Sequence, residues 1–420
     1  MDRYFSLYEL EQQDKSFINR VVYGTVENKI KLDYIINQFS KVSTDKLKMT
    51  VLILFRMSIY QMMYMDSVPD SAVIDEAVKL IKKRKMLNLS GFLNGVLRNI
   101  SRNIDKIEYP KNKDAHYLSV MFSFPLWLID YLLLQYPFEA VEEICASSLK
   151  PSPLCVRHNG LKGTKESLLQ QLQKENIGVK PGHLLPYAYY LEGISALKNI
   201  KSFQLGLFQV QDESSMLIGE IANPKETDVV LDVCAAPGGK TTHLADLMHN
   251  KGKIISRDIS QRKLLLIEEN LKRLGVLNVE LSLQDGSVLD DRQINRFDLV
   301  ITDVPCSGLG IIQRKPDIKY NVSEDGLKSL IQLQRKILET SSEYVKAEGT
   351  LIYSTCTLNQ KENEENVRWF LETHTNFEIV PLVYDFPNQY NTINNEGFLQ
   401  LLPIKETTDG FFIAKLRRMA

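Results

Sequence analysis

Apolar side chains recur at helical spacing from the start of the chain to about residue 135. Two clear runs are Phe17, Val21, Val22 and Val26, followed by Leu32, Ile35, Ile36 and Phe39. Both runs repeat every three to four residues, as the buried face of a helix does. Alternating apolar and polar residues, the pattern of a strand, do not occur in this part. We therefore predict an all-α domain over residues 1–138.

From about residue 228 the pattern changes to short β-rich runs that alternate with longer helical ones. The strand candidates are 229–233, 253–256, 279–283, 297–301 and 349–353, and the helical candidates include 240–248, 260–274 and 327–346. This alternation predicts a parallel, doubly wound α/β sheet, which we assign to residues 206–420. Because such sheets bind ligands at the carboxyl ends of their strands, the residues that follow each strand should carry the chemistry.

A short mixed segment separates these two parts. It opens at a polar, Pro-containing junction at 147–153 and continues with the run 154–159. We predict a small α+β insert over residues 139–205.

The chain contains 5 cysteines, at wide separations: Cys145, Cys155, Cys234, Cys306 and Cys356. This spacing fits neither a disulfide framework nor a zinc site of the Cys-x-x-Cys kind, so we expect a reducing, cytoplasmic location and no metal. Two apolar stretches, 49–65 and 117–136, include polar residues or proline and favour buried helices over membrane spans. No secretory signal is evident at the N-terminus.

The 51 basic and 52 acidic side chains nearly cancel, which excludes a polybasic protein of the histone kind. One stretch departs from this balance. It holds ten basic residues against two acids, Asp105 and Glu108; the basic residues are Lys79, Lys82, Lys83, Arg84, Lys85, Arg98, Arg102, Lys106, Lys111 and Lys113. Such a patch would bind phosphates with salt-dependent affinity, and the alternative is a solubilising helix face.

A tight turn of small residues follows the first predicted strand of the sheet. It consists of Cys234, Ala235, Ala236, Pro237, Gly238, Gly239 and Lys240. Small side chains let a ligand approach the backbone, and the following helix offers free N–H donors. The dinucleotide fingerprint Gly-x-Gly-x-x-Gly is absent, whereas a P-loop lacks only its first glycine, where Cys234 stands.

Carboxylates follow four successive strands: Asp232, Asp258, Asp285 and Asp303. Asp258 is suitably spaced to accept hydrogen bonds from both ribose hydroxyls of an adenosine. Four negative charges would repel a triphosphate but suit S-adenosylmethionine, which carries a sulfonium and an ammonium group. We therefore predict S-adenosylmethionine as the cofactor.

Two cysteines, Cys306 and Cys356, follow the fourth and fifth strands. A thiol becomes a good nucleophile only as the thiolate, so a nearby positive charge is expected to activate it. Methyl transfer to an oxygen or nitrogen needs no such thiol, whereas methylation of a poor carbon nucleophile does. The pair therefore favours carbon methylation.

Motifs of the second half resemble those of the RNA cytosine-5 methyltransferases of the NOL1/NOP2/Sun type. They are Leu231–Ala245, Asp303–Gly310, Arg314–Lys319 and Tyr353–Thr357, together with Gly206–Ser215 and Asp409–Phe412. The first part resembles a NusB-like RNA-binding helical domain in Val22–Gly24, Leu32–Asp33, Ile53–Tyr60, Ala72–Lys79 and Phe92–Arg98.

The resemblance implies that a NusB-like domain, the α+β insert and a Rossmann-like class I methyltransferase domain follow one another. It implies methylation of C5 of a cytosine in 16S rRNA, cytosine 967 in the usual 16S numbering. By resemblance, Cys356 adds to C6 of the base, and Cys306 assists proton removal from C5 or expulsion of Cys356. Asp303 is placed to bind the N3 and N4 edge.

For the cofactor, the resemblance implies that Cys234–Lys240 line the methionine part, that Asp258 binds the ribose, and that Asp285 and Asp303 complete the pocket. Arg157 and Asn159 match an Arg-x-Asn element and are expected to contact RNA, with structural roles as an equal alternative. We expect a monomer. Two other functions stay open, a P-loop NTPase-like RNA-associated protein and a non-catalytic RNA-binding ribosome assembly factor.

Overall fold

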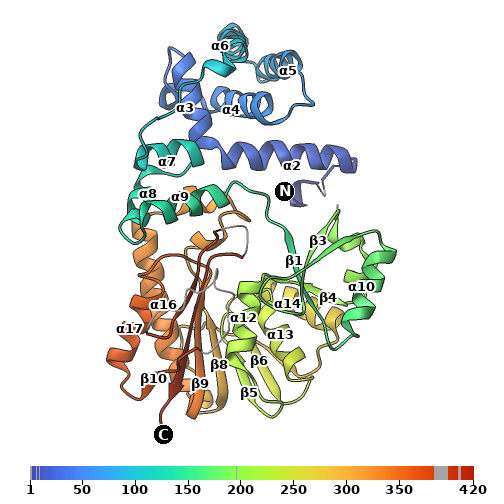
Figure 1. The fold of residues 1–420 in the computed structure, drawn as a ribbon, viewed down its shortest axis with the longest axis vertical. Coiled ribbons are helices and arrows are strands. Elements are labelled where there is room, and N and C mark those ends of the chain that lie inside the picture. The colour runs from blue at the N-terminus through green and yellow to red at the C-terminus, as the bar shows by residue number, and fades with distance from the viewer. Residues whose placement is uncertain (1, 6, 9, 195, 383–395, 405–407) are drawn as a thin grey trace. The chain divides into compact units, whose positions relative to one another are not determined.

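The computed structural model describes all residues except 1, 6, 9, 195, 383–395 and 405–407. The chain divides into two compact units (Figure 1). The first consists of Met1–Leu149 and Lys315–Asn321, and the second of Lys150–Arg314 and Val322–Ala420. The predicted domain borders at 138 and 205 stay predictions, because the second unit contains both the insert and the large sheet.

The first unit is all-α, as predicted. Its helices are α1 (Asp2–Phe5), α2 (Gln12–Glu27), α3 (Lys29–Phe39), α4 (Met49–Tyr64), α5 (Asp70–Lys83), α6 (Ser90–Arg102), α7 (Ala115–Phe122), α8 (Leu126–Leu133), α9 (Phe138–Ser147) and the later α15 (Ile318–Asn321). The periodic residues Leu32, Ile35 and Ile36 are fully buried in its core. Among the described residues, no helix combines the length and the apolarity that crossing a membrane requires.

Residues 315–321 belong to this helical unit. The segments that precede and follow them in sequence belong to the second unit. Lys319 is fully buried, and its Nζ donates to the carbonyl oxygens of Glu27 at 2.9 Å and of Phe122 at 3.2 Å. Burial lowers the pKa of Lys319 to about 8, although Cys145 and Glu27 oppose the shift. The motif Arg314–Lys319 is therefore anchored by a desolvated cation.

The small α+β insert is confirmed as a four-stranded antiparallel sheet with strand order β2-β3-β1-β4. Its elements are β1 (Leu154–His158), α10 (Lys165–Lys174), β2 (Gly178–Pro181), β3 (Ala188–Glu192), α11 (Lys201–Gln204) and β4 (Phe208–Val210). Leu168 and Leu172 of α10 are fully buried against one face of this sheet.

The large sheet has the order β10-β12-β9-β8-β5-β6-β7, with β11 paired to β12. The five predicted strands are confirmed as β5 (Val229–Asp232), β6 (Lys253–Asp258), β7 (Val279–Leu283), β8 (Phe297–Asp303) and β9 (Val345–Thr355). The three predicted helices correspond to α13 (Gly239–Leu247), α14 (Gln261–Leu274) and α16 (Glu324–Tyr344). Together with α12 (Glu213–Ala222) and α17 (Glu364–Thr373) they cover the sheet, α12, α13 and α14 on one face and α16 and α17 on the other (Figure 1).

The five predicted strands are parallel to one another, as predicted, but the sheet as a whole is mixed. The strands β10 (Phe377–Ile379), β11 (Leu399–Leu401) and β12 (Phe411–Arg418) were not predicted, and β12 runs antiparallel to β9. An antiparallel strand needs no helical crossover, so the helix–strand alternation that identified the other strands is missing here. The core of the sheet remains Rossmann-like.

The substitution Lys319→Met is expected to change how stability depends on pH. The ordinary pKa of this lysine is 10.5 and the folded value is about 8, so between these values the unfolded chain binds a proton that the folded chain has released. As the pH rises from about 8 to about 10, the wild type should gain up to about 1 kcal/mol per pH unit relative to the variant. Urea unfolding of both proteins measures this difference. Parallel pH profiles would contradict the prediction.

Candidate active site

The loop between β5 and α13 leaves its backbone open to a ligand. Gly238 caps α13 with a φ of 96°, a left-handed conformation that favours glycine. A Cβ there would lie 3.0 Å from Cγ2 of Ile267, whereas beside Gly239 the nearest atom, Cδ of Gln211, would be 3.8 Å away. Cys234, Ala236, Pro237, Gly239 and Lys240 are at least partly exposed, and Ala235 and Gly238 are buried. The loop has the small side chains and the helix N-terminus that the predicted cofactor site requires.

Two of the strand-end carboxylates keep acceptor capacity for a ligand. Asp258 Oδ1 accepts from the backbone N–H of Ser260 at 3.0 Å, while its Oδ2 has only a distant cation, Lys263 at 3.7 Å. Asp285 accepts from the N–H and hydroxyl of Ser287, and these hydrogen bonds lower its pKa. Both therefore fit a group that offers hydroxyl or amino donors, as adenosine does.

Asp232 was predicted to belong to the same set of strand-end carboxylates, but its side chain is fully buried. Its Oδ2 accepts from the Thr241 hydroxyl at 2.7 Å, and burial raises its pKa to about 6. A side chain with no exposed surface cannot contact a ligand directly. Asp232 therefore fixes the start of α13, and its proposed contact with a ligand is not supported.

Asp303 and Lys240 form an ion pair at the end of β8. Lys240 Nζ lies 2.5 Å from Asp303 Oδ2, and the Ser354 hydroxyl donates to Asp303 Oδ1 at 3.0 Å. Burial alone would lower the pKa of Lys240, but the Asp303 carboxylate outweighs it and raises the pKa. The ammonium group therefore stays charged, and it also interacts electrostatically with Cys356.

The two predicted thiols meet. The parallel register of β8 and β9 places Asp303 opposite Ser354, and the loops that follow bring Cys306 Sγ to 3.3 Å from Cys356 Sγ. Both side chains are partly exposed. The hydrogen bond to Cys356, together with burial, raises the pKa of Cys306 well above its ordinary range. Cys306 therefore holds its proton firmly beside the sulfur of Cys356.

A buried carboxylate behind the thiols was absent from the predicted site. Glu362, six residues after Cys356, accepts hydrogen bonds from both the N–H and the hydroxyl of Ser307, the residue after Cys306. In the sequence, Glu362 is marked only by its position in the loop that follows β9. That position alone gives no reason to select it.

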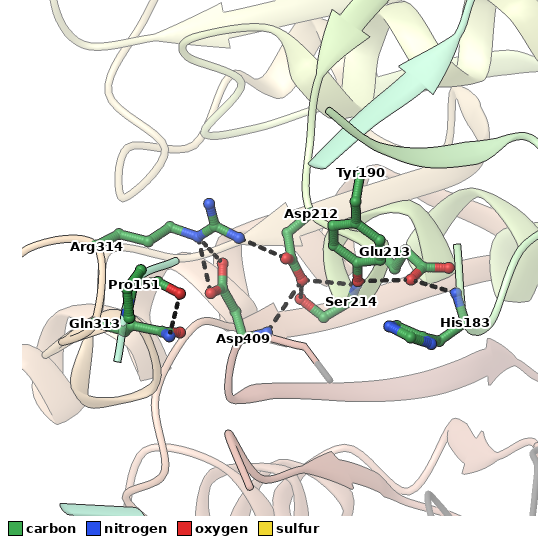
Figure 2. A network of polar contacts seen from close by, with 9 residues as sticks. All are labelled: Pro151, His183, Tyr190, Asp212, Glu213, Ser214, Gln313, Arg314 and Asp409. Atoms are coloured by element: carbon green, nitrogen blue, oxygen red, sulfur yellow. Dashed lines mark hydrogen bonds and ion pairs between the residues drawn. The ribbon is translucent and has the colours of Figure 1, made fainter. Parts of the chain in front are cut away.

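Arg314 joins three segments around the site (Figure 2). Its Nε lies 2.8 and 2.7 Å from the two carboxylate oxygens of Asp409, and one terminal nitrogen donates to Asp212 Oδ2 at 2.7 Å. Burial and the neighbouring Asp212 raise the pKa of Asp409 to about 7, and Arg314 opposes the shift. The motifs that resembled the family at 210–212, 314 and 409 thus form one charge network.

This network reaches the loop that carries Cys356 through the backbone. The N–H of Gly410 donates to the Gly310 carbonyl at 2.8 Å, and the N–H of Gly310 donates to the Cys356 carbonyl at 3.0 Å. A Cβ on Gly310 would lie 2.1 Å from the Gly410 carbonyl oxygen, so this close approach needs glycine.

Arg157 and Asn159 have structural roles in this unit. Arg157 is buried and donates to Gln211 at 2.9 Å and to Asp246 at 2.8 Å. The amide of Asn159, also buried, donates to the carbonyl oxygens of Gly206 and Leu274. The structure therefore favours the structural alternative over the expected RNA contact.

All ten basic residues of the 79–113 stretch are exposed. Three of them pair with acids, Lys79 with Glu76, Arg98 with Asp75 and Lys113 with Glu142. Among the residues that the structure describes, no group of three or more His, Cys, Asp or Glu side chains could hold a metal ion.

Three family models and a relative match most of the chain. A family model for the 16S rRNA methyltransferase RsmB/F matches residues 220–417, a NusB family model matches 3–102, and a ferredoxin-like domain of RsmF/B-like methyltransferases matches 124–197. The chain is 40% identical to a probable ribosomal RNA small subunit methyltransferase B of Bacillus subtilis, over 98% of this chain and 92% of the relative.

Two solved structures agree with this result. The structure of PH0851 has a TM-score of 0.82 at 27% identity and covers 99% of this chain and 93% of that one. NSun6 from Pyrococcus horikoshii, solved with SFG, has a TM-score of 0.64 at 26% identity and covers 71% and 100%. The chain belongs to the RsmB/F family of 16S rRNA methyltransferases, and its cofactor is S-adenosylmethionine.

Proposed function

We propose that this protein methylates C5 of a cytosine in 16S rRNA, with cytosine 967 as the target, through a covalent adduct between Cys356 and C6 of the base. The contact of the two thiols beside the Lys240–Asp303 ion pair carries this proposal. Bound S-adenosylmethionine supplies the methyl group. Methyl transfer to a heteroatom would give no role to a pair of thiols in contact at the catalytic edge.

Cys356 is the nucleophile in this proposal. C5 of cytosine is a poor nucleophile in the aromatic ring, so a sulfur must first add to C6 and make C5 enamine-like. The Cys306 thiol, whose pKa is raised, lies 3.3 Å from Cys356 Sγ and is close enough to donate a hydrogen bond to a thiolate there. The Lys240 ammonium adds positive charge nearby. Both effects favour the reactive form of Cys356.

Cys306 acts after methyl transfer. The C5 proton must leave and the bond between sulfur and C6 must break, which restores the aromatic ring. Once the Cys306 thiol has given its proton to water, its thiolate is a strong base that can take the C5 proton. The C–H electron pair then forms the C5–C6 double bond and the sulfur of Cys356, 3.3 Å from Cys306 Sγ, leaves as thiolate. Cys306 is therefore suited to take the C5 proton or to assist expulsion of Cys356.

Asp303 is proposed to bind the N3 and N4 edge of the base and to offset the charge that develops on addition. The base must reach these groups unstacked, which costs least in a loop or single strand of RNA. The exposed basic residues of 79–113 would hold the rRNA through its phosphates, without reading sequence. Action on ribosomal RNA agrees with the expected cytoplasmic location.

The residues proposed for the cofactor are unchanged from the sequence prediction. Cys234–Lys240 would line its methionine part, Asp258 would accept from the ribose hydroxyls, and Asp285 with Asp303 would complete the pocket. Asp258 Oδ2, which accepts no hydrogen bond among the described residues, and the open backbone at Gly239 support this assignment. Family membership leaves the P-loop alternative without support, and the paired thiols argue against a non-catalytic assembly factor.

Replacement of the two cysteines should separate the two chemical steps. Cys356→Ala should abolish methylation, because no sulfur remains to add to C6. Cys306→Ala should still form the adduct but release it slowly, and so accumulate enzyme bound to RNA. Unmodified 16S rRNA, labelled S-adenosylmethionine and denaturing gels measure both effects, and nucleoside mass spectrometry identifies the methylated atom.

Cys145→Ala is the matched control for these variants, because Cys145 is a buried cysteine of the helical unit. It should keep wild-type turnover. Full activity of Cys356→Ala, or a product methylated on nitrogen or ribose oxygen, would overturn the proposed function.

Asp258→Ala should weaken cofactor binding by about 10- to 100-fold, since hydrogen bonds to a charged acceptor contribute about 1.5–3 kcal/mol. Isothermal titration calorimetry with S-adenosylmethionine tests this, with Glu269→Ala as a control on the exposed surface of α14. ATP should bind neither protein. Equal affinities of the two variants would remove Asp258 from the proposed cofactor site.

A further inference from the structure

Glu362 is a carboxylate with no exposed surface in the loop between β9 and α17. Among the described residues, none forms an ion pair with it within 4 Å. Burying a carboxylate without a cation costs free energy, which is offset only when its oxygens are fully hydrogen-bonded. The chemistry of its partners therefore explains why a carboxylate stands there.

Among the described residues, the carboxylate oxygens of Glu362 accept four hydrogen bonds. Oε2 accepts from the backbone N–H of Ser307 at 2.9 Å and from Nε2 of Gln334 at 2.8 Å. Oε1 accepts from the Ser307 hydroxyl at 2.5 Å and from Nδ2 of Asn359 at 3.0 Å. Only an acceptor-only group satisfies this set, because the NH₂ of an amide would face another donor.

These contacts fix the chain on both sides of Cys306. Gln334 Nε2 also donates to the Pro305 carbonyl at 3.0 Å, so the residue before Cys306 and the residue after it are bound to one network. Pro305 itself is exposed, whereas Val304 before it and Leu309 after it are buried, so the hydrogen bonds fix the exposed part of a loop that apolar packing holds at both ends.

The same network reaches the second thiol. The Ser307 hydroxyl lies 2.6 Å from the hydroxyl of Thr357, the residue after Cys356. The backbone carbonyl of Glu362 accepts from the buried Tyr353 hydroxyl at 2.6 Å, which ties the loop to β9. Glu362 thus connects the two loops at the residues that follow their cysteines.

We propose that Glu362 is a positioning residue that holds the Cys306 thiol against Cys356 and is needed for release of the methylated RNA. This inference rests on the proposed function, because it assigns Glu362 to the step that Cys306 performs. Glu362 does not touch the reacting atoms. It acts through Ser307.

The test compares Glu362→Gln with wild type, Cys306→Ala and Glu365→Gln. Glu365 is an exposed carboxylate three residues away, so its variant controls for the loss of a negative charge in this region. Glu362→Gln should lower kcat about tenfold, leave KM for RNA within about twofold, and raise the fraction of enzyme trapped on RNA toward that of Cys306→Ala. A general loss of structure would lower adduct formation and kcat together. Glu365→Gln should behave as wild type.

Ser307→Ala provides a second, milder variant if Glu362→Gln does not fold. It removes one hydroxyl from the network and should shift kcat and adduct in the same direction. Where both variants fold, their effects on kcat should be less than additive in the double variant, because they act through the same contact.

Three outcomes overturn the inference. Wild-type turnover of Glu362→Gln is one, and loss of its activity without adduct in a protein that melts normally is another. In both cases an adduct trapped by Cys306→Ala would leave the proposed function intact. If Cys306→Ala traps no adduct and Cys356→Ala stays active, the proposed function fails and the inference with it.

Discussion

The parallel ladder between β8 and β9 is the constraint on which the site depends. Its register sets Asp303 beside Ser354, so the two loops that leave the sheet there start side by side. Parallel strands project their following loops from the same edge, which brings together cysteines fifty residues apart in sequence. A register shift would change the position of both sulfurs relative to Lys240 and would break the Ser354–Asp303 hydrogen bond.

Charged and polar contacts act together with apolar packing to hold the loops at this edge, where Val304, Leu309 and Leu358 are buried. Arg314 lies between Asp212 and Asp409, Lys240 binds Asp303, and Glu362 accepts donors from the Cys306 loop. Directional contacts fix side-chain position more narrowly than apolar contacts do, and they leave room for small residues where ligands must approach. The cost is burial of charged groups, visible in the raised pKa of Asp409.

The sequence was sufficient for the parts of the fold that follow a regular period. The five strands β5 to β9 and the three predicted helices appear where predicted, because β5, β6 and β8 are buried apolar runs and a helical run follows each of them. The strands β10 to β12 lack that helix signal and were missed. Contacts between distant segments were equally out of reach: nothing near Lys319 in sequence indicates that this lysine is buried against the carbonyl of Glu27.

The site itself divides in the same way. Residues at strand ends, such as Cys306, Cys356 and Asp303, could be selected from the sequence because their place on the sheet follows from the strand pattern. Residues that support them could not. Glu362 is a polar residue whose role depends on which donors the fold brings to it, and only the three-dimensional arrangement supplies those partners.

The proton on the thiol pair links the geometry to the order of the chemistry. The proposed mechanism places one proton between two sulfurs in contact, and the sulfur that keeps this proton cannot attack. The high pKa of Cys306 assigns the proton to that residue. In the proposed mechanism, adduct formation removes the partner of this hydrogen bond. Under that proposal the same contact would favour attack by Cys356 first and leave Cys306 to take part afterwards.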